Sequence, residues 1–172
     1  MAASNLSLQE QSMCDHRAGC VGLGSVMESP GGHSERALRV LLVDDNVDVI
    51  ESLAILLRMY GYSVLTCTHP LDALEAAPDF SPDVCILDIG LPCMSGHELA
   101  QRLRMEGLSR SVFIAVTGYG ADEFRAASGA AGFALHLTKP VDPEFLLGRL
   151  TGVHRAARVA SIANAAAGKE NS

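Results

Sequence analysis

Residues 38–45 read LRVLLVDD, an apolar run with strand character that ends in two adjacent aspartates. Only Arg39 interrupts the run, and continuous apolar stretches of this kind are typical of strands that are buried on both faces of a parallel sheet. Further along the chain, the apolar stretches that end in Asp88 and Thr117 repeat the arrangement. The sequence therefore predicts several buried strands, each followed by a polar side chain.

Strand and helix patterns alternate five times between residues 37 and 154. Strands are predicted over 38–43, 63–67, 84–87, 112–116 and 133–137. Helices are predicted over 47–60, 70–77, 96–105, 121–130 and 143–153. This alternation implies an α/β fold with a parallel sheet and helices on both faces. Because right-handed crossovers leave few topologies, we expect a flavodoxin-like, doubly wound five-stranded sheet with the strand order 2-1-3-4-5.

The two ends of the chain differ from its middle. Residues 1–36 are rich in Ser, Gly, Glu and Gln without a persistent period, which predicts a flexible N-terminal extension. Residues 155–172 are predicted to be a flexible C-terminal tail whose Ala-rich part can extend the last helix before it frays. Neither stretch has room for a DNA-binding or enzymatic output domain. We therefore expect the domain at 37–154 to act through contacts with other proteins.

The charge and hydropathy of the chain exclude several functions. The net charge of −7 argues against non-specific binding to the nucleic-acid backbone. No apolar run approaches the roughly 18 residues of a membrane span, and the N-terminus lacks the basic and apolar regions of a secretory signal. We expect a cytoplasmic protein, a monomer or weak dimer, with no nucleic-acid or membrane partner.

The five cysteines are odd in number and irregular in spacing. In a cytoplasmic protein, this predicts reduced thiols. Cys14, His16 and Cys20 are of metal-binding types, but the segment lacks a second ligand pair, so a zinc site is the less favoured interpretation.

The polar residues at the strand ends have complementary chemistry. Strands 1 and 3 are neighbours in the expected order, so Asp44, Asp45 and Asp88 should meet at one rim of the sheet. Three carboxylates repel one another unless a cation is present, and Mg²⁺ prefers such oxygen ligands. Asp88 can then act as a nucleophile that forms an acyl phosphate. The Thr117 hydroxyl and the Lys139 ammonium group can stabilise the oxygens of the transferring phosphoryl group.

Each of these residues also has a purely structural interpretation. Asp45 or Asn46 can cap the following helix, and Asp88 can be a loop carboxylate. A threonine after a strand is often a turn residue, and Lys139 can lie in a solvated loop. Their conjunction on one rim favours a phosphoryl and metal site.

Four segments carry a resemblance to a known family: residues 43–46 (VDDN), 87–96 (LDIGLPCMSG), 116–118 (VTG) and 137–140 (LTKP). Their spacing is 43 residues from Asp45 to Asp88, 29 more to Thr117 and 22 more to Lys139. In these segments and spacings, residues 38–153 resemble the receiver domain of two-component response regulators.

This resemblance implies a role for each site residue. Asp88 would accept a phosphoryl group from a phosphohistidine on a histidine kinase or a histidine phosphotransfer protein. Asp45 and Asp88 would bind Mg²⁺ directly, Asp44 through water, and the Gly90 carbonyl would be a further ligand. Thr117 and Lys139 would be the catalytic residues that hold the phosphoryl group.

The resemblance also implies a switch. His136 lies three residues before Lys139, where receivers have an aromatic residue or a histidine whose ring turns inward as Thr117 moves toward the phosphoryl group. The alternative is that His136 simply packs on an edge strand. Gly90 and Tyr119 occupy positions that tune slow loss of the phosphoryl group to water, so the chain would not be an enzyme in the usual sense.

Residues 132–143 resemble receivers attached to hybrid histidine kinases, so the chain would signal to a downstream protein or pass the group on in a phosphorelay. Two alternatives remain. A phosphohydrolase of the haloacid dehalogenase type needs a second aspartate where this chain has Gly90. A receiver-like binding module that is never phosphorylated would not need the complete acidic set.

Overall fold

The computed structural model describes residues 36–118 and 132–167, with side chains up to residue 156. It divides into two compact units, of which one extends to Lys139 and the other begins at Pro140. Among the described residues, no helix is long and apolar enough to cross a membrane.

The first unit is built on five parallel strands in the order β2-β1-β3-β4-β5, which confirms the predicted topology. The strands are β1 (Arg39–Val43), β2 (Ser63–Cys67), β3 (Val84–Asp88), β4 (Val112–Thr117) and β5 (Leu135–Thr138). Every residue of the central strand β3 is buried, as expected for a strand covered on both faces.

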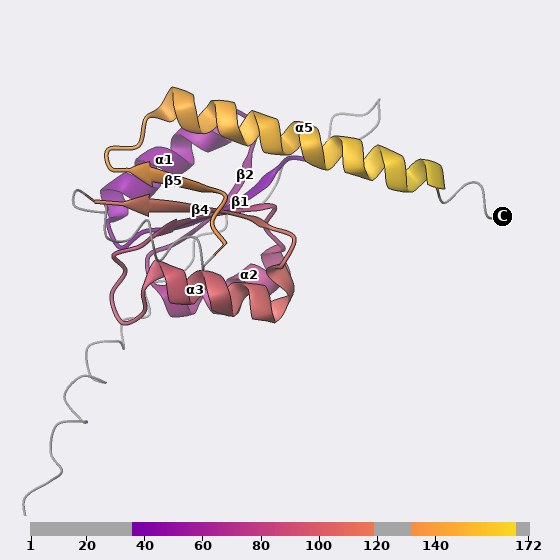
Figure 1. Ribbon diagram of the computed structural model, residues 1–172. Coiled ribbons are helices and arrows are strands. Elements are labelled where there is room, and N and C mark those ends of the chain that lie inside the picture. The colour runs from indigo at the N-terminus through magenta and orange to yellow at the C-terminus, as the bar shows by residue number, and fades with distance from the viewer. Residues whose placement is uncertain (1–35, 119–131, 168–172) are drawn as a thin grey trace, which may run out of the picture. The chain divides into compact units, whose positions relative to one another are not determined.

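Helices cover both faces of this sheet (Figure 1). On one face lie α2 (Pro70–Phe80) and α3 (Gly96–Leu103), which continues into a π-helical turn, η2 (Arg104–Leu108). On the other face lies α1 (Val47–Met59). The main hydrophobic core forms where α2 and α3 pack on the sheet, around Leu87, Leu99 and Phe113.

Two helix ends differ from the prediction. Helix α2 was expected to end at Ala77 but continues to Phe80 with Pro78 inside it. Pro78 is exposed in the last turn, where its missing N–H removes one intrahelical hydrogen bond, and the helix then ends at Ser81 in the left-handed conformation. Helix α3 was expected to reach residue 105 but ends at Leu103, because the chain widens into η2 there.

Strand β5 is shifted relative to the predicted span of 133–137. It begins at Leu135, because Phe133 packs against the core beside the strand instead of joining it. Strand β4 includes Thr117 as its last residue. The predicted helix over 121–130 lies outside the described residues.

The second unit contains α5 (Pro143–Ala167). The Asp142 carboxylate caps its start by accepting hydrogen bonds from the backbone N–H groups of Glu144 (2.9 Å) and Phe145 (3.3 Å). The helix continues past the predicted end at residue 153 through the Ala-rich stretch, since alanine has the highest helix propensity.

Candidate functional site

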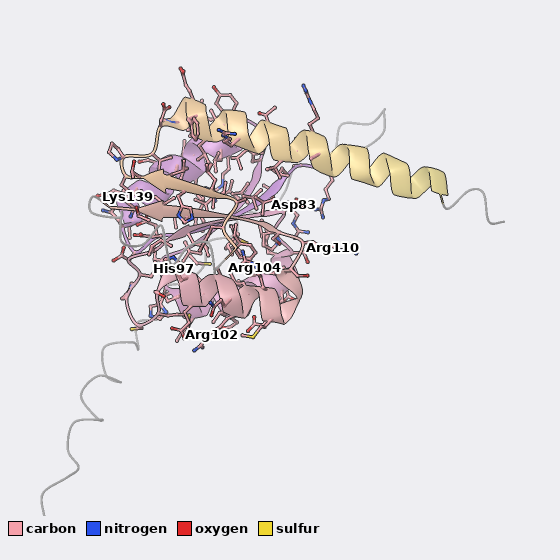
Figure 2. All side chains as sticks on the ribbon, in the orientation of Figure 1. Asp83, His97, Arg102, Arg104, Arg110 and Lys139 are labelled. Atoms are coloured by element: carbon pink, nitrogen blue, oxygen red, sulfur yellow. The ribbon has the colours of Figure 1, made fainter. Side chains whose placement is uncertain are left out.

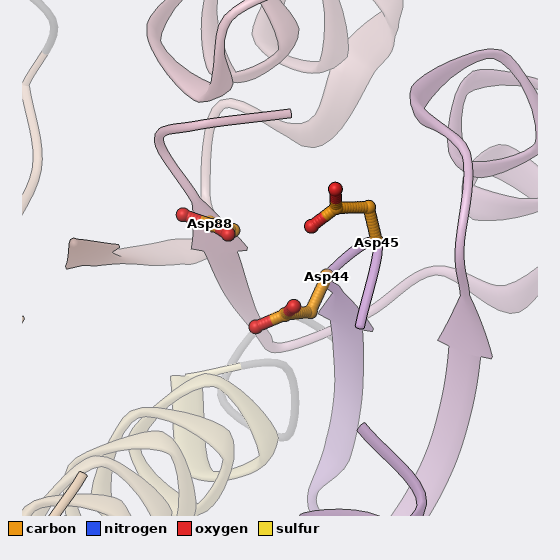
Figure 3. A group of neighbouring side chains, drawn as sticks. All are labelled: Asp44, Asp45 and Asp88. Atoms are coloured by element: carbon orange, nitrogen blue, oxygen red, sulfur yellow. The ribbon is translucent and has the colours of Figure 1, made fainter. Parts of the chain in front are cut away.

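Three carboxylates meet at the rim where the parallel strands end, as predicted. Asp44 and Asp45 follow β1, and Asp88 is the last residue of the neighbouring strand β3 (Figure 3). One ligand oxygen from each lies within 4.8 Å of the others. Asp44 and Asp88 are buried, whereas Asp45 is exposed.

The start of α1 shows which residue caps the helix. The Asn46 side chain accepts hydrogen bonds from the N–H groups of Asp48 (3.1 Å) and Val49 (3.2 Å), and the N–H of Asn46 donates to Asp44 Oδ1 (3.0 Å). Asn46 is therefore the N-cap, and Asp45 faces the other two carboxylates.

Lys139 reaches both buried carboxylates from the end of β5. Its Nζ lies 2.7 Å from Asp44 Oδ2 and 2.6 Å from Asp88 Oδ2, while Asp88 Oδ1 accepts the N–H of Gly90 at 2.9 Å. Burial by itself lowers the pKa of Lys139, but the hydrogen bonds and charges of Asp44 and Asp88 outweigh it, so the pKa is raised overall. The ammonium group therefore stays charged and balances the two carboxylates.

Thr117 lies beside this group at the end of β4. It is buried, its hydroxyl donates to the Gly118 carbonyl (3.3 Å), and its own carbonyl accepts the N–H of Lys139 (2.7 Å). His136, the predicted switch residue, is partly buried on β5, with its ring edge against Phe133. Tyr119 lies outside the described residues.

The loop between β3 and α3 passes very close to the site, and Gly96 makes this possible. A Cβ atom at Gly96 would lie 2.2 Å from the Asp88 carbonyl oxygen, and the Gly96 N–H donates to the carbonyl of Ile89 (3.1 Å). Sequence reasoning placed Gly96 in a matching segment without giving it a role, because only the backbone path reveals the close approach. The predicted N-cap Ser95 is confirmed by its bond from the Glu98 N–H (3.3 Å).

The cysteines differ in part from the expectation of reduced thiols. Cys93, which is exposed in this loop with a φ of 65°, is disulfide-bonded. Cys67 and Cys85 are buried thiols, and burial raises the pKa of Cys85 to about 12. The predicted reduced state is therefore wrong for Cys93. Cys14, His16 and Cys20 lie outside the described residues.

The site fits a hard divalent cation. All ligand groups of the cluster are carboxylate oxygens, they lie close together, and one of them is open to solvent. Mg²⁺ prefers oxygen ligands and keeps several waters, so a partly exposed set of three carboxylates suits it. The sequence-predicted residues Asp44, Asp45, Asp88, Thr117 and Lys139 are thus brought to one rim.

The structure thus combines a doubly wound sheet of strand order 2-1-3-4-5 with three carboxylates at one rim. The family model for the response regulator receiver domain matches residues 40–151. The chain therefore belongs to the response regulator receiver family of two-component systems, as the sequence resemblance predicted.

Two curated relatives are transcriptional regulators. The chain is 34% identical over 117 residues to the phosphate regulon transcriptional regulatory protein PhoB of Pseudomonas aeruginosa, covering 67% of this chain and 51% of that protein. It is also 34% identical over 116 residues to the transcriptional regulatory protein KdpE of Mycobacterium tuberculosis, covering 67% of this chain and 50% of that protein. The chain thus spans about half the length of the curated relatives it matches.

Solved structures show the same fold over nearly their whole length. The chemotaxis response regulator CheY4 of Vibrio cholerae is 30% identical with a TM-score of 0.63, covering 68% of this chain and 98% of that one. A CheY-like receiver domain protein of Methanospirillum hungatei JF-1 is 27% identical with a TM-score of 0.66, covering 72% and 98%. Membership of this family sets aside the phosphohydrolase alternative.

Proposed function

We propose that this receiver accepts a phosphoryl group on Asp88 from a phosphohistidine of a histidine kinase or a histidine phosphotransfer protein. The observation that supports this most is the position of Asp88: it is buried at the end of the central strand, 2.6 Å from Lys139 Nζ and within reach of Asp44 and Asp45. A buried carboxylate held next to a lysine ammonium group is well placed to react with a phosphoryl group.

The transfer would follow from this geometry. A carboxylate oxygen of Asp88 attacks phosphorus, the new O–P bond forms as the P–N bond of the phosphohistidine breaks, and the imidazole nitrogen keeps the bonding electron pair. The Lys139 ammonium group, which already contacts Asp88, stabilises charge on the phosphoryl oxygens. The Thr117 hydroxyl donates a hydrogen bond to one of those oxygens, and slow hydrolysis later restores the free carboxylate.

Receiver domains generally bind Mg²⁺, and here Asp45 and Asp88 would hold it directly, Asp44 through water, with the Gly90 carbonyl as a further ligand. When bound, the ion would supply positive charge that favours the approach of the phosphoryl group to a carboxylate. A Cβ atom at Gly90 would lie 3.7 Å from Asp88 Oδ1, so the glycine leaves this side of the carboxylate uncovered.

The proposed partners are proteins. Val47 and Val49 are exposed at the start of α1, next to Asp45, and offer apolar contacts to a kinase or phosphotransfer helix. The signal would pass to a downstream protein or along a phosphorelay. The receiver domain at 37–154, the flexible extension 1–36 and tail 155–172, the cytoplasmic location, the monomeric or weakly dimeric state and the absence of nucleic-acid binding remain predictions.

Labelling with acetyl phosphate and Mg²⁺ tests the proposal. The intact mass of the protein should rise by one phosphoryl group, and the adduct should be stable in acid and labile in base. Asp88→Asn should abolish the gain, whereas Asp48→Asn, a change in the exposed first turn of α1, should leave it intact. Full labelling of the Asp88→Asn variant would refute the assignment, and no adduct on the wild type would favour the unphosphorylated binding module.

A further inference from the structure

Phe133 is the centre of an aromatic cluster that joins three elements of the first unit. Its ring makes edge-to-face contacts with His97 of α3 (centroids 5.6 Å apart), Phe113 of β4 (6.4 Å) and His136 of β5 (5.5 Å). Aromatic rings prefer this geometry because the positive edge of one ring meets the negative face of another. The proposed switch residue His136 therefore packs against Phe133, which is not one of the residues that would bind the metal or the phosphoryl group.

Arg104, at the start of η2, holds the backbone beside Phe133. Its guanidinium group stacks on the Phe113 ring at 4.0 Å and donates to the Gly132 carbonyl at 2.8 Å. Gly132 has a φ of 68°, and a Cβ atom there would lie 3.4 Å from the guanidinium nitrogen, so glycine suits both the turn and the contact. His97 and Arg104 lie seven residues apart on the side of α3 and η2 that faces the sheet (Figure 2).

The register of β4 and β5 shows the direction in which this cluster holds His136. Phe113, Ala115 and Thr117 alternate onto the same face of β4, and Ala115 pairs with His136. The Ala134 N–H donates to the Phe113 carbonyl, so Phe133 lies toward the end of the sheet opposite the acidic rim. The His136 ring thus contacts a residue on the side away from the acidic rim, whereas Thr117 lies at the rim end of β4.

The residue that pairs with His136 on the neighbouring strand is small. Ala115 is fully buried and lies between Phe113 and Thr117 on this face. In this structure the His136 ring packs on Phe133, and the arrangement that the proposed switch requires is a ring turned over Ala115 toward Thr117. A side chain with two packed positions is the kind of element whose populations a ligand can shift.

We propose that Phe133 and Arg104 are positioning residues that hold His136 away from Thr117 and so set how readily the receiver responds to phosphorylation. This inference rests on the proposed function, because it concerns the switch coupled to Asp88. Phe133 would act by direct contact with His136. Arg104 would act through the Gly132 carbonyl and the Phe113 ring, which fix where Phe133 lies.

The test measures binding of beryllofluoride, a phosphoryl analogue, to the full chain with saturating Mg²⁺. The variants are Phe133→Leu, which removes the ring, and Arg104→Met, which keeps the aliphatic stem but loses the guanidinium group. Arg102→Met is the matched control, because Arg102 is an exposed arginine in the last turn of α3, just before η2, and pairs with Glu98 at 2.7 Å.

We expect both variants to bind the analogue about two- to tenfold more tightly than the wild type, because the contact that opposes the turned position is gone. The control should match the wild type. In a His136→Ala background, Phe133→Leu should no longer change the affinity, since the residue that it positions is absent.

The direction of the change in analogue affinity distinguishes the proposed positioning role from a purely structural one. If Phe133→Leu and Arg104→Met only loosened the fold, analogue binding would weaken or stay unchanged while the melting temperature fell, and the proposal would be overturned. A gain that persisted in the His136→Ala background would also overturn it. Failure of the proposed function would look different, because the wild type itself would then not bind the analogue.

Discussion

Lys139 lies between two buried carboxylates, and its ammonium nitrogen is 2.7 Å from Asp44 and 2.6 Å from Asp88. Removing one member of such a group leaves the others buried without their counter-charge, which costs more than the pair contributes when it is intact. The same ammonium group is placed to meet an incoming phosphoryl group. At the scale of single residues, stability and the proposed chemistry therefore depend on the same contact.

Lys139→Met should lower the free energy of unfolding at pH 7 by about 1–3 kcal/mol, because Asp44 and Asp88 lose their partner. Since the pKa of Lys139 is raised above 10.5, its contribution is complete at lower pH and declines as the pH rises past 10.5 through the raised value. Urea unfolding from pH 7 to about 11.5 should show the wild type and the variant converging at the alkaline end. A constant difference over this range would contradict the assigned contact.

Asp45 is the exposed member of the acidic cluster, and its removal should relieve repulsion. Without Mg²⁺, Asp45→Ala should melt at the same or a slightly higher temperature than the wild type. With Mg²⁺ at a hundred times its dissociation constant, the wild type should gain about 2.7 kcal/mol, and the variant should lose most of this gain. Glu51→Ala, an exposed change on α1, should keep it. Marked destabilisation of Asp45→Ala without Mg²⁺ would count against the cluster.

At the scale of elements, the loop from β3 to α3 sets the backbone around Asp88. Ser95 starts α3, and Gly96 lets that start lie against the Asp88 carbonyl. The obstacle to any larger residue is backbone, which cannot rotate away as a side chain can. The position of the proposed phosphoacceptor thus depends on a residue that takes no part in its chemistry.

Gly96→Ala should therefore lower the free energy of unfolding by about 1–3 kcal/mol and slow labelling of Asp88, because the loop must shift to admit the methyl group. Gly118→Ala is the control for stability, since a Cβ atom there has no atom within 4 Å. Thermal melts of the two variants provide the comparison. Equal melting temperatures would show that the loop accommodates a side chain at residue 96.

At the scale of the whole molecule, a phosphoryl group at Asp88 adds charge and oxygen acceptors near Thr117 and Lys139. Thr117 ends β4, and its backbone carbonyl is bonded to the N–H of Lys139 after β5, so a shift of one strand end affects the other. The response should therefore spread along β4 and β5.

Beryllofluoride with Mg²⁺ should change the amide chemical shifts of residues 135–138, and Thr117→Ala should reduce these changes while the analogue still binds. The hydroxyl is the group that links the phosphoryl oxygens to the strand, so its loss uncouples the two. Two-dimensional NMR of both proteins makes the measurement. Unchanged shifts in the wild type with the analogue bound would leave Asp88 as a relay station without a switch.

Much of this protein follows from local sequence patterns. The alternation of apolar strands and amphipathic helices predicted the strand order, and polar residues after the strands predicted the acidic rim, because parallel strands bring their ends to one edge. The ends of the helices and strands were less predictable. Helix α2 continues past Pro78, and Phe133 packs against the core instead of forming the start of β5. In both places, packing outweighed local preference.

Only the tertiary structure decided which atoms meet. Lys139 and Asp88 are 51 residues apart, and the sequence alone does not say that one ammonium group bridges Asp88 and Asp44. Nor does it show the close approach at Gly96 or the ring contacts around Phe133. The reason is physical: residue type and strand order are local or topological properties, whereas contacts at 3 Å depend on how helices, loops and strands pack against one another.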